Sequence, residues 1–340
     1  MSIKKMLVIL GVLALSAIFL AACAGPAGPA GPAGPAGPAG PAGPAGPAGE
    51  SVSATDLSCT GCHNDTSNLT GKQEAWAASF HGSGPAFDHA GGNATCTGCH
   101  SGSGFSAAIA AGADNAAAQD SALVNPSRID CRACHQIHTS YTTDDWALET
   151  TDPVALIAVD GATYDGGKGN LCAHCHQPRT AFPEATDGNV SVTSTHWGGH
   201  HGPVDAMLLG VNAALGVEGK PSPHYQNVED TCVACHMGGD NANHTFTPDI
   251  ATCQTCHSDA TDFDINGTQT EIEDKLTQVE DALKAKGLLD DTGTIVVGDY
   301  PEAQAGALWN YLFVEEDKSM GVHNSTYANN MLDAALEALK

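Results

Sequence analysis

The stretch CRACHQIH, from Cys131 to His138, places two Cys side chains three residues apart, a His directly after the second Cys, and another His three residues later. The Cys-x-x-Cys-His part of this stretch occurs six times in the 340-residue chain. In chain order the six motifs read CTGCH, CTGCH, CRACH, CAHCH, CVACH and CQTCH, and begin at positions 59, 96, 131, 172, 232 and 253. They use twelve of the thirteen Cys residues, so one chemistry accounts for all but one of them.

The spacing within each motif is typical of covalent c-type haem attachment. Two thiols separated by two residues can reach both vinyl groups of one porphyrin, and the adjacent imidazole can bind the iron. Zinc ribbons also use Cys-x-x-Cys pairs but need no His after every second Cys. We therefore expect six c-type haems. The expected attachment residues are Cys59, Cys62, Cys96, Cys99, Cys131, Cys134, Cys172, Cys175, Cys232, Cys235, Cys253 and Cys256, and the expected proximal iron ligands are His63, His100, His135, His176, His236 and His257.

Each iron also has a second axial position, and ten of the sixteen His residues remain to fill it. Ten His residues are enough to give each of the six haems a second His ligand. Four Met residues after the leader are alternatives. The distal candidates are His81, His138, His196, His201, His224, His244 and His323. In THWGGHHGP, which starts at Thr195, at least one of three His residues is expected to bind iron, and His200 is the third of them.

Three of the remaining assignments depend on position. His138 follows His135 too closely to reach around its own porphyrin, because three residues span at most about 10 Å, so it is expected to ligate a neighbouring haem. His174 lies inside its own attachment loop and is expected to face solvent. His89 has no supporting turn residues around it and is not a favoured candidate.

The N-terminus predicts export and lipidation. Two Lys residues precede an apolar stretch that ends in Leu20-Ala21-Ala22-Cys23, as in a bacterial lipoprotein signal. The stretch of about 15 residues is short for crossing a hydrocarbon core of about 30 Å. We expect cleavage before Cys23, acylation of its thiol, and a location at the outer membrane or cell surface. This also explains the odd Cys.

Eight Gly-Pro-Ala triplets follow, from Gly25 to Ala48. Gly at every third position beside Pro is the composition of a collagen-like triple helix, which would make the protein a homotrimer. The favoured alternative is a semi-rigid stalk in extended polyproline conformation, which would span up to about 75 Å at about 3.1 Å per residue. Either structure would hold the remainder of the chain away from the membrane.

Charge excludes one class of partner. The chain has 13 Lys+Arg against 39 Asp+Glu and a formal net charge of −26. Nucleic acids are bound by Lys and Arg through counterion release, so we expect no nucleic-acid binding. Redox partner proteins are expected to dock through basic faces.

Two features of the composition bear on the fold. Aromatic residues make up only 5% of the chain, so porphyrins are expected to replace side chains as the core around the motifs. Beyond the last motif, apolar residues at Ile272, Leu276, Val279 and Leu283 predict an amphipathic helix that ends at Gly287. A second helix is expected from Pro301 and a third capped by Ser325, with one strand over residues 294–298. The expected fold is mainly α with extensive irregular loops and a helical C-terminal tail.

The lipoprotein signal, the stalk and the motifs together resemble the exported multihaem c-type cytochromes of metal-reducing bacteria. From Trp76 onward the stretches CRACHQIHTSYTTDDWAL, NLCAHCHQPR, HHGP and GVHNSTYANNMLDAALEAL look like a hexahaem group of that class. The resemblance implies a multihaem cytochrome organised around a chain of haems, which carries electrons to an extracellular acceptor and is not an enzyme. Haem-containing reductases of nitrogen or sulfur oxyanions are the alternative, although the Cys-x-x-Cys-Lys motif of one such catalytic haem is absent.

These observations predict four parts. They are a signal peptide over residues 1–22, a lipid-anchored stalk over 23–50, a hexahaem domain over 51–265, and a helical region over 266–340 that packs on the haem domain.

Overall fold

The computed structural model describes residue 63 and residues 67–114, 116, 125–239 and 242–340. The signal peptide, Cys23, the Gly-Pro-Ala repeat, Cys59 and Cys62 lie outside the described residues, so the expectations for them stay predictions. Residues 52–340 form one unit, to which all the described elements belong. None of the described helices is long and apolar enough to cross a membrane.

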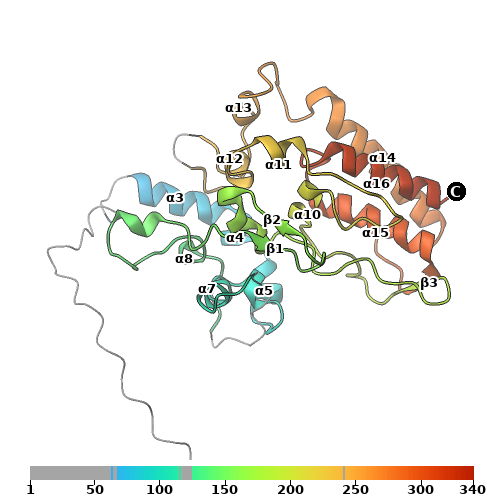
Figure 1. Cartoon of the computed structure of the whole chain (residues 1–340), viewed down its shortest axis with the longest axis horizontal. Coiled ribbons are helices and arrows are strands. Elements are labelled where there is room, and N and C mark those ends of the chain that lie inside the picture. The colour runs from blue at the N-terminus through green and yellow to red at the C-terminus, as the bar shows by residue number, and fades with distance from the viewer. Residues whose placement is uncertain (1–62, 64–66, 115, 117–124, 240–241) are drawn as a thin grey trace, which may run out of the picture. The chain divides into compact units, whose positions relative to one another are not determined.

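Short helices separated by loops make up the part of the chain that contains the motifs (Figure 1). Four of them, α6, α8, α9 and α12, start at or beside a motif and last only one turn. The α-helices of this part are α3 (Ser67–Ala78), α4 (Phe80–Ser83), α5 (Ala86–Ala90), α6 (Thr97–His100), α7 (Gly102–Ala110), α8 (Cys131–Cys134), α9 (Asn170–Ala173), α10 (Val204–Leu209), α11 (Pro223–Asn227), α12 (Cys232–His236) and α13 (Ile250–Cys253). Three 3₁₀ turns accompany them: η2 (Thr143–Trp146), η3 (Gly167–Gly169) and η4 (Ile265–Gly267).

Three longer helices form the C-terminal region: α14 (Thr268–Ala285), α15 (Glu302–Asp317) and α16 (Ser325–Ala338). They lie side by side in Figure 1 and contact one another. The predicted stripe of α14 is confirmed, since Ile272, Leu276, Val279 and Leu283 are all buried. The predicted starts are each one residue away from the observed ones. Pro301 precedes α15 and does not begin it, and Asn324 caps α16 in place of Ser325.

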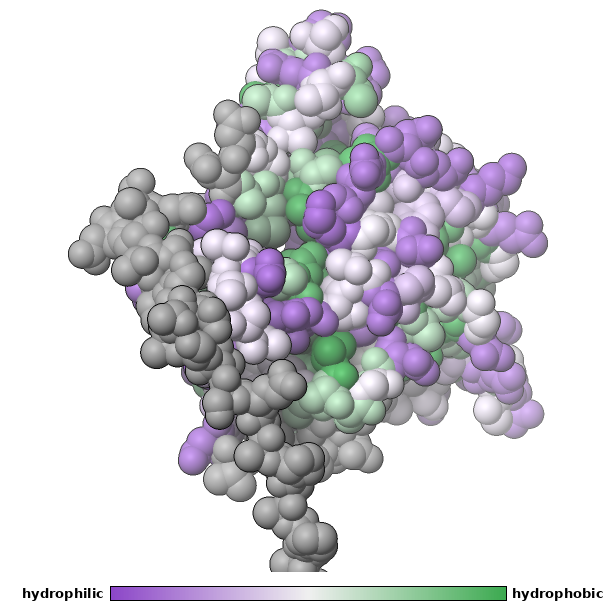
Figure 2. Space-filling view, turned by 60° about the vertical axis from the view of Figure 1, so that its left-hand side comes forward, coloured by the Kyte–Doolittle hydropathy of each residue, from purple (hydrophilic) through white to green (hydrophobic). Residues whose placement is uncertain are grey.

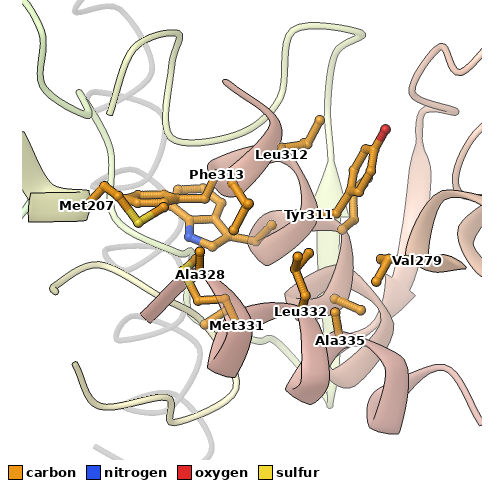
Figure 3. Packing of buried hydrophobic residues seen from close by; sticks show 14 of the residues in the cluster. Met207, Val279, Tyr311, Leu312, Phe313, Ala328, Met331, Leu332 and Ala335 are labelled. Atoms are coloured by element: carbon orange, nitrogen blue, oxygen red, sulfur yellow. The ribbon is translucent and has the colours of Figure 1, made fainter. Parts of the chain in front are cut away.

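Helix α15 is the centre of this region, because its residues are buried almost continuously from Ala305 to Val314. Tyr311, Leu312 and Phe313 of α15 belong to one buried cluster with Met207 and with Met331, Leu332 and Ala335 of α16 (Figure 3). Trp309 is 1% exposed, and its indole N–H donates to the carbonyl of Asn212 at 2.9 Å. A helix that is apolar on all sides needs neighbours on all sides, and here α14, α16, α10 and β3 supply them.

The four strands of the described residues form two small antiparallel ladders. Strands β1 (Val154–Ala155) and β2 (Thr163–Tyr164) pair with each other, and β3 (Asn189–Val192) pairs with β4 (Gly298–Pro301). The strand expected over residues 294–298 is therefore displaced toward the C-terminus. Residues 290–294 close a tight turn instead, in which the Asp290 carboxylate accepts from the amides of Thr292 and Thr294 at 2.8 and 2.9 Å.

Large side chains are unevenly distributed between the two parts of this unit. The main apolar cluster is built on the C-terminal helices, whereas the second cluster consists of Phe105, Ala116 and Ala133 beside the second and third motifs. In Figure 2 the visible face is mostly hydrophilic, with apolar residues in separate patches. Side chains alone thus supply little core around the described motifs, as the shortage of aromatic residues predicts.

Candidate functional site

Each fully described motif closes one turn of α-helix. The amide of the motif His donates to the carbonyl of the first Cys in the second, third, fourth and sixth motifs, at 3.0, 2.9, 3.0 and 2.8 Å. Residues three apart lie on the same face of such a turn, so both thiols point to one side and the imidazole follows them. The ten described Cys residues are free thiols, as thioether attachment requires.

Every motif His has a second His as its ring partner. The six pairs are His63–His138, His100–His200, His135–His244, His176–His81, His236–His323 and His257–His224, with ring centres 6.2, 6.0, 6.2, 6.1, 6.3 and 6.3 Å apart. Two of the partners lie on short helices, His81 on α4 and His224 on α11, and the other four lie in loops.

This separation is what two imidazoles on opposite sides of one metal ion require. A metal–nitrogen bond of about 2.0 Å plus about 1.1 Å from each nitrogen to its ring centre gives about 6.2 Å for trans ligation. The described pairs therefore fit the two axial positions of a haem iron, beside a thiol pair that fits its two vinyl groups.

Hydrogen bonds orient several of these rings. The Nδ1–H groups of His135, His236 and His224 donate to backbone carbonyls at 2.8, 2.9 and 2.8 Å, and that of His244 does so at 2.7 Å. A carbonyl can only accept, so the proton belongs on Nδ1, and Nε2 keeps its lone pair for a metal. His323 instead donates to the Asp317 carboxylate at 2.8 Å. Such second partners fix the tautomer and the orientation of a ligating imidazole.

Burial favours the neutral form of several paired His residues. It lowers the pKa of His176 and of His200 to about 4, with help from nearby positive charges, and it also lowers the pKa of His81. A neutral imidazole is the form that binds iron. At His323 burial lowers the pKa, but the Asp317 charge and hydrogen bond outweigh burial and raise it.

Many protein atoms surround His176, and yet the residue is exposed at the surface. A residue in this position is one that a flat macrocycle lying against it would cover.

Two backbone positions bring partner His residues into place. His138 and His200 both have left-handed backbone, with φ of 65° and 78°, which costs a residue with a side chain of order 1–3 kcal/mol. Around His138 the loop is held by Asp145, whose carboxylate accepts from the amides of His138 and Ser140 at 2.8 and 2.6 Å. Burial raises the pKa of Asp145, but these hydrogen bonds outweigh it and the net pKa is lowered.

The three His residues of the THWGGHHGP loop have different surroundings. His200 lies against His100. His201 donates from Nδ1 to the Glu316 carboxylate at 2.9 Å and pairs with no motif His among the described residues. His196 lies against His89, 6.3 Å between ring centres. The sequence prediction named His196 and His201 as distal ligands and gave His200 only as the third His of the loop. No local feature distinguishes the three residues, because they share one loop.

His174 is not solvent-facing as expected from the sequence: it is 3% exposed. Both of its ring nitrogens are buried without a hydrogen-bond partner in the protein. Burial lowers the pKa of His174, so the ring is neutral and one nitrogen has a proton to donate. A buried polar group is rarely left unsatisfied, which points to a non-protein partner such as a carboxylate of a bound cofactor.

Sulfur contacts bring three motifs together. Thiols of different motifs lie close enough to shift one another's pKa: Cys175 lowers the pKa of Cys99, and Cys232 raises the pKa of Cys172. The fourth motif therefore lies between the second and the fifth. Any groups attached through these sulfur atoms would be in direct contact.

Ring contacts connect the third motif to the first and fourth. His135 and His138 are three residues apart and belong to different pairs, so the third and first pairs are neighbours. Phe246 lies 4.6 Å from His81 and 6.1 Å from His244, between the fourth and third pairs.

The fifth and sixth motifs are close as well. Burial, and then the charges of Cys253 and Cys256, raise the pKa of Cys235. In space, the motifs therefore follow one another in the order first, third, fourth, fifth and sixth. The second motif lies beside the fourth and forms a branch.

Comparison with known proteins shows the fold. No protein-family profile and no curated protein matches the sequence. The structure resembles that of the outer cell wall cytochrome OcwA, with a TM-score of 0.52, 24% identity, and coverage of 79% of this chain and 50% of that one. Weaker matches are an undecahaem S-layer cytochrome of Carboxydothermus ferrireducens (TM-score 0.45, 19% identity, 76% and 40% coverage) and the cytochrome c nitrite reductase of Desulfovibrio desulfuricans (0.40, 18%, 72% and 64%). The chain spans half the length of OcwA and has the mainly helical, loop-rich cytochrome fold expected from its sequence.

Proposed function

We propose that this chain is an electron-transfer protein that carries six c-type haems. The observation that carries the proposal is the pairing of every motif His with a second His at 6.0–6.3 Å. An iron with two imidazoles has no free axial position, so it can change oxidation state but cannot bind a substrate.

The Cys and His residues of the motifs and their partners would have distinct roles. The twelve motif Cys residues would hold the porphyrins through thioether bonds, and the twelve paired His residues would fill the axial positions. When bound, haem supplies a one-electron couple between ferrous and ferric iron. The protein sets the separation of the haems, the basicity of each axial ligand, and the burial around it.

The neighbour order supports a conducting path. A line of contacts from the first through the third, fourth and fifth motifs to the sixth would let an electron pass between adjacent haems. Cys172 and Cys175 would put the fourth haem at the junction, because each lies against a Cys of another motif. The second haem would branch from that junction.

We further propose that the path runs at the cell surface. The proposed arrangement keeps the division made from the sequence: a signal peptide over residues 1–22, a stalk anchored by lipid on Cys23, a hexahaem domain over 51–265 and a helical region over 266–340. The net charge of −26 supports a soluble redox partner with a basic face, or a charge-tolerant extracellular acceptor. A homotrimer through the stalk remains the alternative to a tethered monomer.

A reductase of nitrogen or sulfur oxyanions is the second candidate, and the described geometry disfavours it. Such an enzyme needs one iron with an open position, yet each of the six motif His residues already has a partner ring.

Carbon monoxide binding to the reduced holoprotein tests the proposal. We expect no stoichiometric spectral change in the wild type, since all irons are six-coordinate. The variant His81→Ala is the positive control: it removes the partner of His176 and should open one iron, so that one haem in six binds the gas. His201→Ala is the matched negative control, because His201 pairs with Glu316 and with no described motif His. Stoichiometric binding by the wild type, or a change on addition of nitrite, would favour the reductase.

A further inference from the structure

One pair of His residues is not explained by the six motifs. His89 and His196 lie with their ring centres 6.3 Å apart, within the range of the six motif pairs. Neither residue follows a Cys-x-x-Cys sequence, and both are exposed. The pair therefore has the separation of an axial ligand pair without the Cys residues for covalent attachment.

The separation distinguishes between two kinds of metal site. Two imidazoles on a tetrahedral ion would have ring centres about 5.1 Å apart, against about 6.2 Å for trans ligation with the same bond length. The observed 6.3 Å corresponds to trans ligation. Two other His contacts in the same loop lie outside the 6.0–6.3 Å range of the six motif pairs: His200–His201 is 5.4 Å and His196–His201 is 6.5 Å. No group of three or more His, Cys, Asp or Glu side chains suited to a bare ion occurs among the described residues.

Hydrogen bonds and an ion pair fix the backbone beside both residues. His89 lies on α5 (Figure 1), where the neighbouring Asp88 forms an ion pair with Arg128 at 2.5 Å and the amide of His89 donates to the carbonyl of Pro85 at 2.9 Å. The amide of His196 donates to the Ser194 hydroxyl at 3.2 Å.

The residue after His196 anchors this turn to the C-terminal core. Trp197 is 9% exposed, and its ring lies 5.5 Å from that of Trp309 and 6.4 Å from that of Phe182. The packing of Trp197 thus fixes the backbone of the turn that presents His196.

The pair also lies next to the second motif pair. The ring of His196 lies 6.5 Å from that of His201, and the ring of His201 lies 5.4 Å from that of His200. Because His200 belongs to the second motif pair, the two pairs meet in this loop.

We propose that His89 and His196 are the axial ligands of a seventh haem, bound through its iron alone without thioether bonds. The class of ligand is an iron porphyrin, because trans ligation by two imidazoles leaves the equatorial plane to a macrocycle. The site would extend the branch from the fourth and second haems to the protein surface. This proposal can fail independently of the six-haem function. The number of covalently bound haems tests that function, whereas the number of haems that can be extracted tests this proposal.

The test separates covalent from extractable haem in the full-length protein matured with its six haems. Acid acetone removes haem that is held only through iron, and the pyridine spectrum before and after extraction gives both counts. Haemin is then titrated into the intact holoprotein to fill any empty site. We expect one extractable, low-spin haem per chain beside six covalent ones.

Three single variants make the test specific. His89→Ala and His196→Ala should each reduce extractable haem at least tenfold and leave the covalent count at six. His201→Ala, in the same loop, should retain it. The proposal is overturned if the wild type neither contains extractable haem nor binds one equivalent of haemin, or if His201→Ala loses as much as the other two variants. It is also overturned if Zn²⁺ or Ni²⁺ binds at these residues while haemin does not, which would mean a bare ion site.

Discussion

Replacing Asp317 by Asn should raise the reduction potential of one haem and leave the others unchanged. Asp317 has a side chain only 1% exposed, and its carboxylate accepts a hydrogen bond from Nδ1 of His323 at 2.8 Å. His323 in turn lies 6.3 Å from the motif residue His236. The buried negative charge thus lies one imidazole away from the proposed fifth iron, where it stabilises the ferric form.

The size of the shift follows from the distance. The carboxylate would lie about 7 Å from an iron bound to Nε2, so at an effective dielectric constant of about 20 its interaction with one unit of charge is about 2.4 kcal/mol. About 1.4 kcal/mol corresponds to about 59 mV for a one-electron couple. An Asn side chain keeps a weaker hydrogen bond, so part of the effect survives. We expect an increase of about 50–100 mV.

A redox titration followed by EPR, which resolves individual low-spin haems, measures this shift. Glu316→Gln is the matched control, because Glu316 accepts from Nδ1 of His201 at 2.9 Å, and His201 pairs with no described motif His. The control should move none of the six potentials by a comparable amount. The reasoning is refuted if Asp317→Asn leaves every potential within about 10 mV, or if Glu316→Gln produces an equal shift.

Three further predictions concern ligation and stability. His138→Ala should convert one haem in six to high spin, since His138 is the ring partner of His63. The EPR spectrum of the variant should keep the low-spin signal of the haem bound by His135. Asp205→Asn should raise the thermal midpoint at pH 7: burial raises the pKa of Asp205, and one carboxylate oxygen is unsatisfied at a cost of about 1–3 kcal/mol. Because the pKa of Asp205 is higher in the folded than in the unfolded state, its destabilising effect appears only as pH rises above the unfolded pKa. The increase in thermal midpoint caused by Asp205→Asn should therefore vanish near pH 3. An equal increase at pH 3 and pH 7 would contradict this. Trp309→Ala should destabilise the C-terminal region by about 3–5 kcal/mol in denaturant unfolding, whereas Phe80→Ala, at a residue 88% exposed, should cost less than about 0.5 kcal/mol.

The parts of the molecule that depend on local sequence could be predicted. The apolar stripe of α14 repeats at helical intervals, so its buried face follows from the sequence alone. The expected cap at Ser325 was wrong by one residue. Asn and Ser cap about equally well, but the Asn324 side-chain amide also donates to the carbonyls of Met207 and Lys220, which favours Asn324. Those two carbonyls lie more than a hundred residues away and are invisible to a local pattern.

The partner of each motif His could be predicted only as a member of a set. His196, His200 and His201 share one glycine-rich loop, and nothing local distinguishes them. The structure separates them through distant residues: Glu316 binds His201, and the packing of Trp197 on Trp309 directs the loop so that His200 faces His100.

The burial of His174 and the spatial order of the motifs could not be predicted either, because both depend on residues that are distant in the sequence. Burial of His174 depends on Phe105, whose ring lies 5.6 Å away in a helix that follows another motif. The contact of Cys99 with Cys175 joins motifs that are not consecutive in the chain. Spacing along the chain suggests that the fifth and sixth motifs are neighbours but says nothing of this branch.

The central claim is that every motif holds a haem closed by two imidazoles. Intact mass gives the number of covalent haems per full-length chain, and EPR of the same oxidised sample gives the spin state of each iron. The account predicts six covalent haems, each with a low-spin iron, and no high-spin signal near stoichiometry. Fewer than six covalent haems, or one full equivalent of high-spin iron, would contradict it.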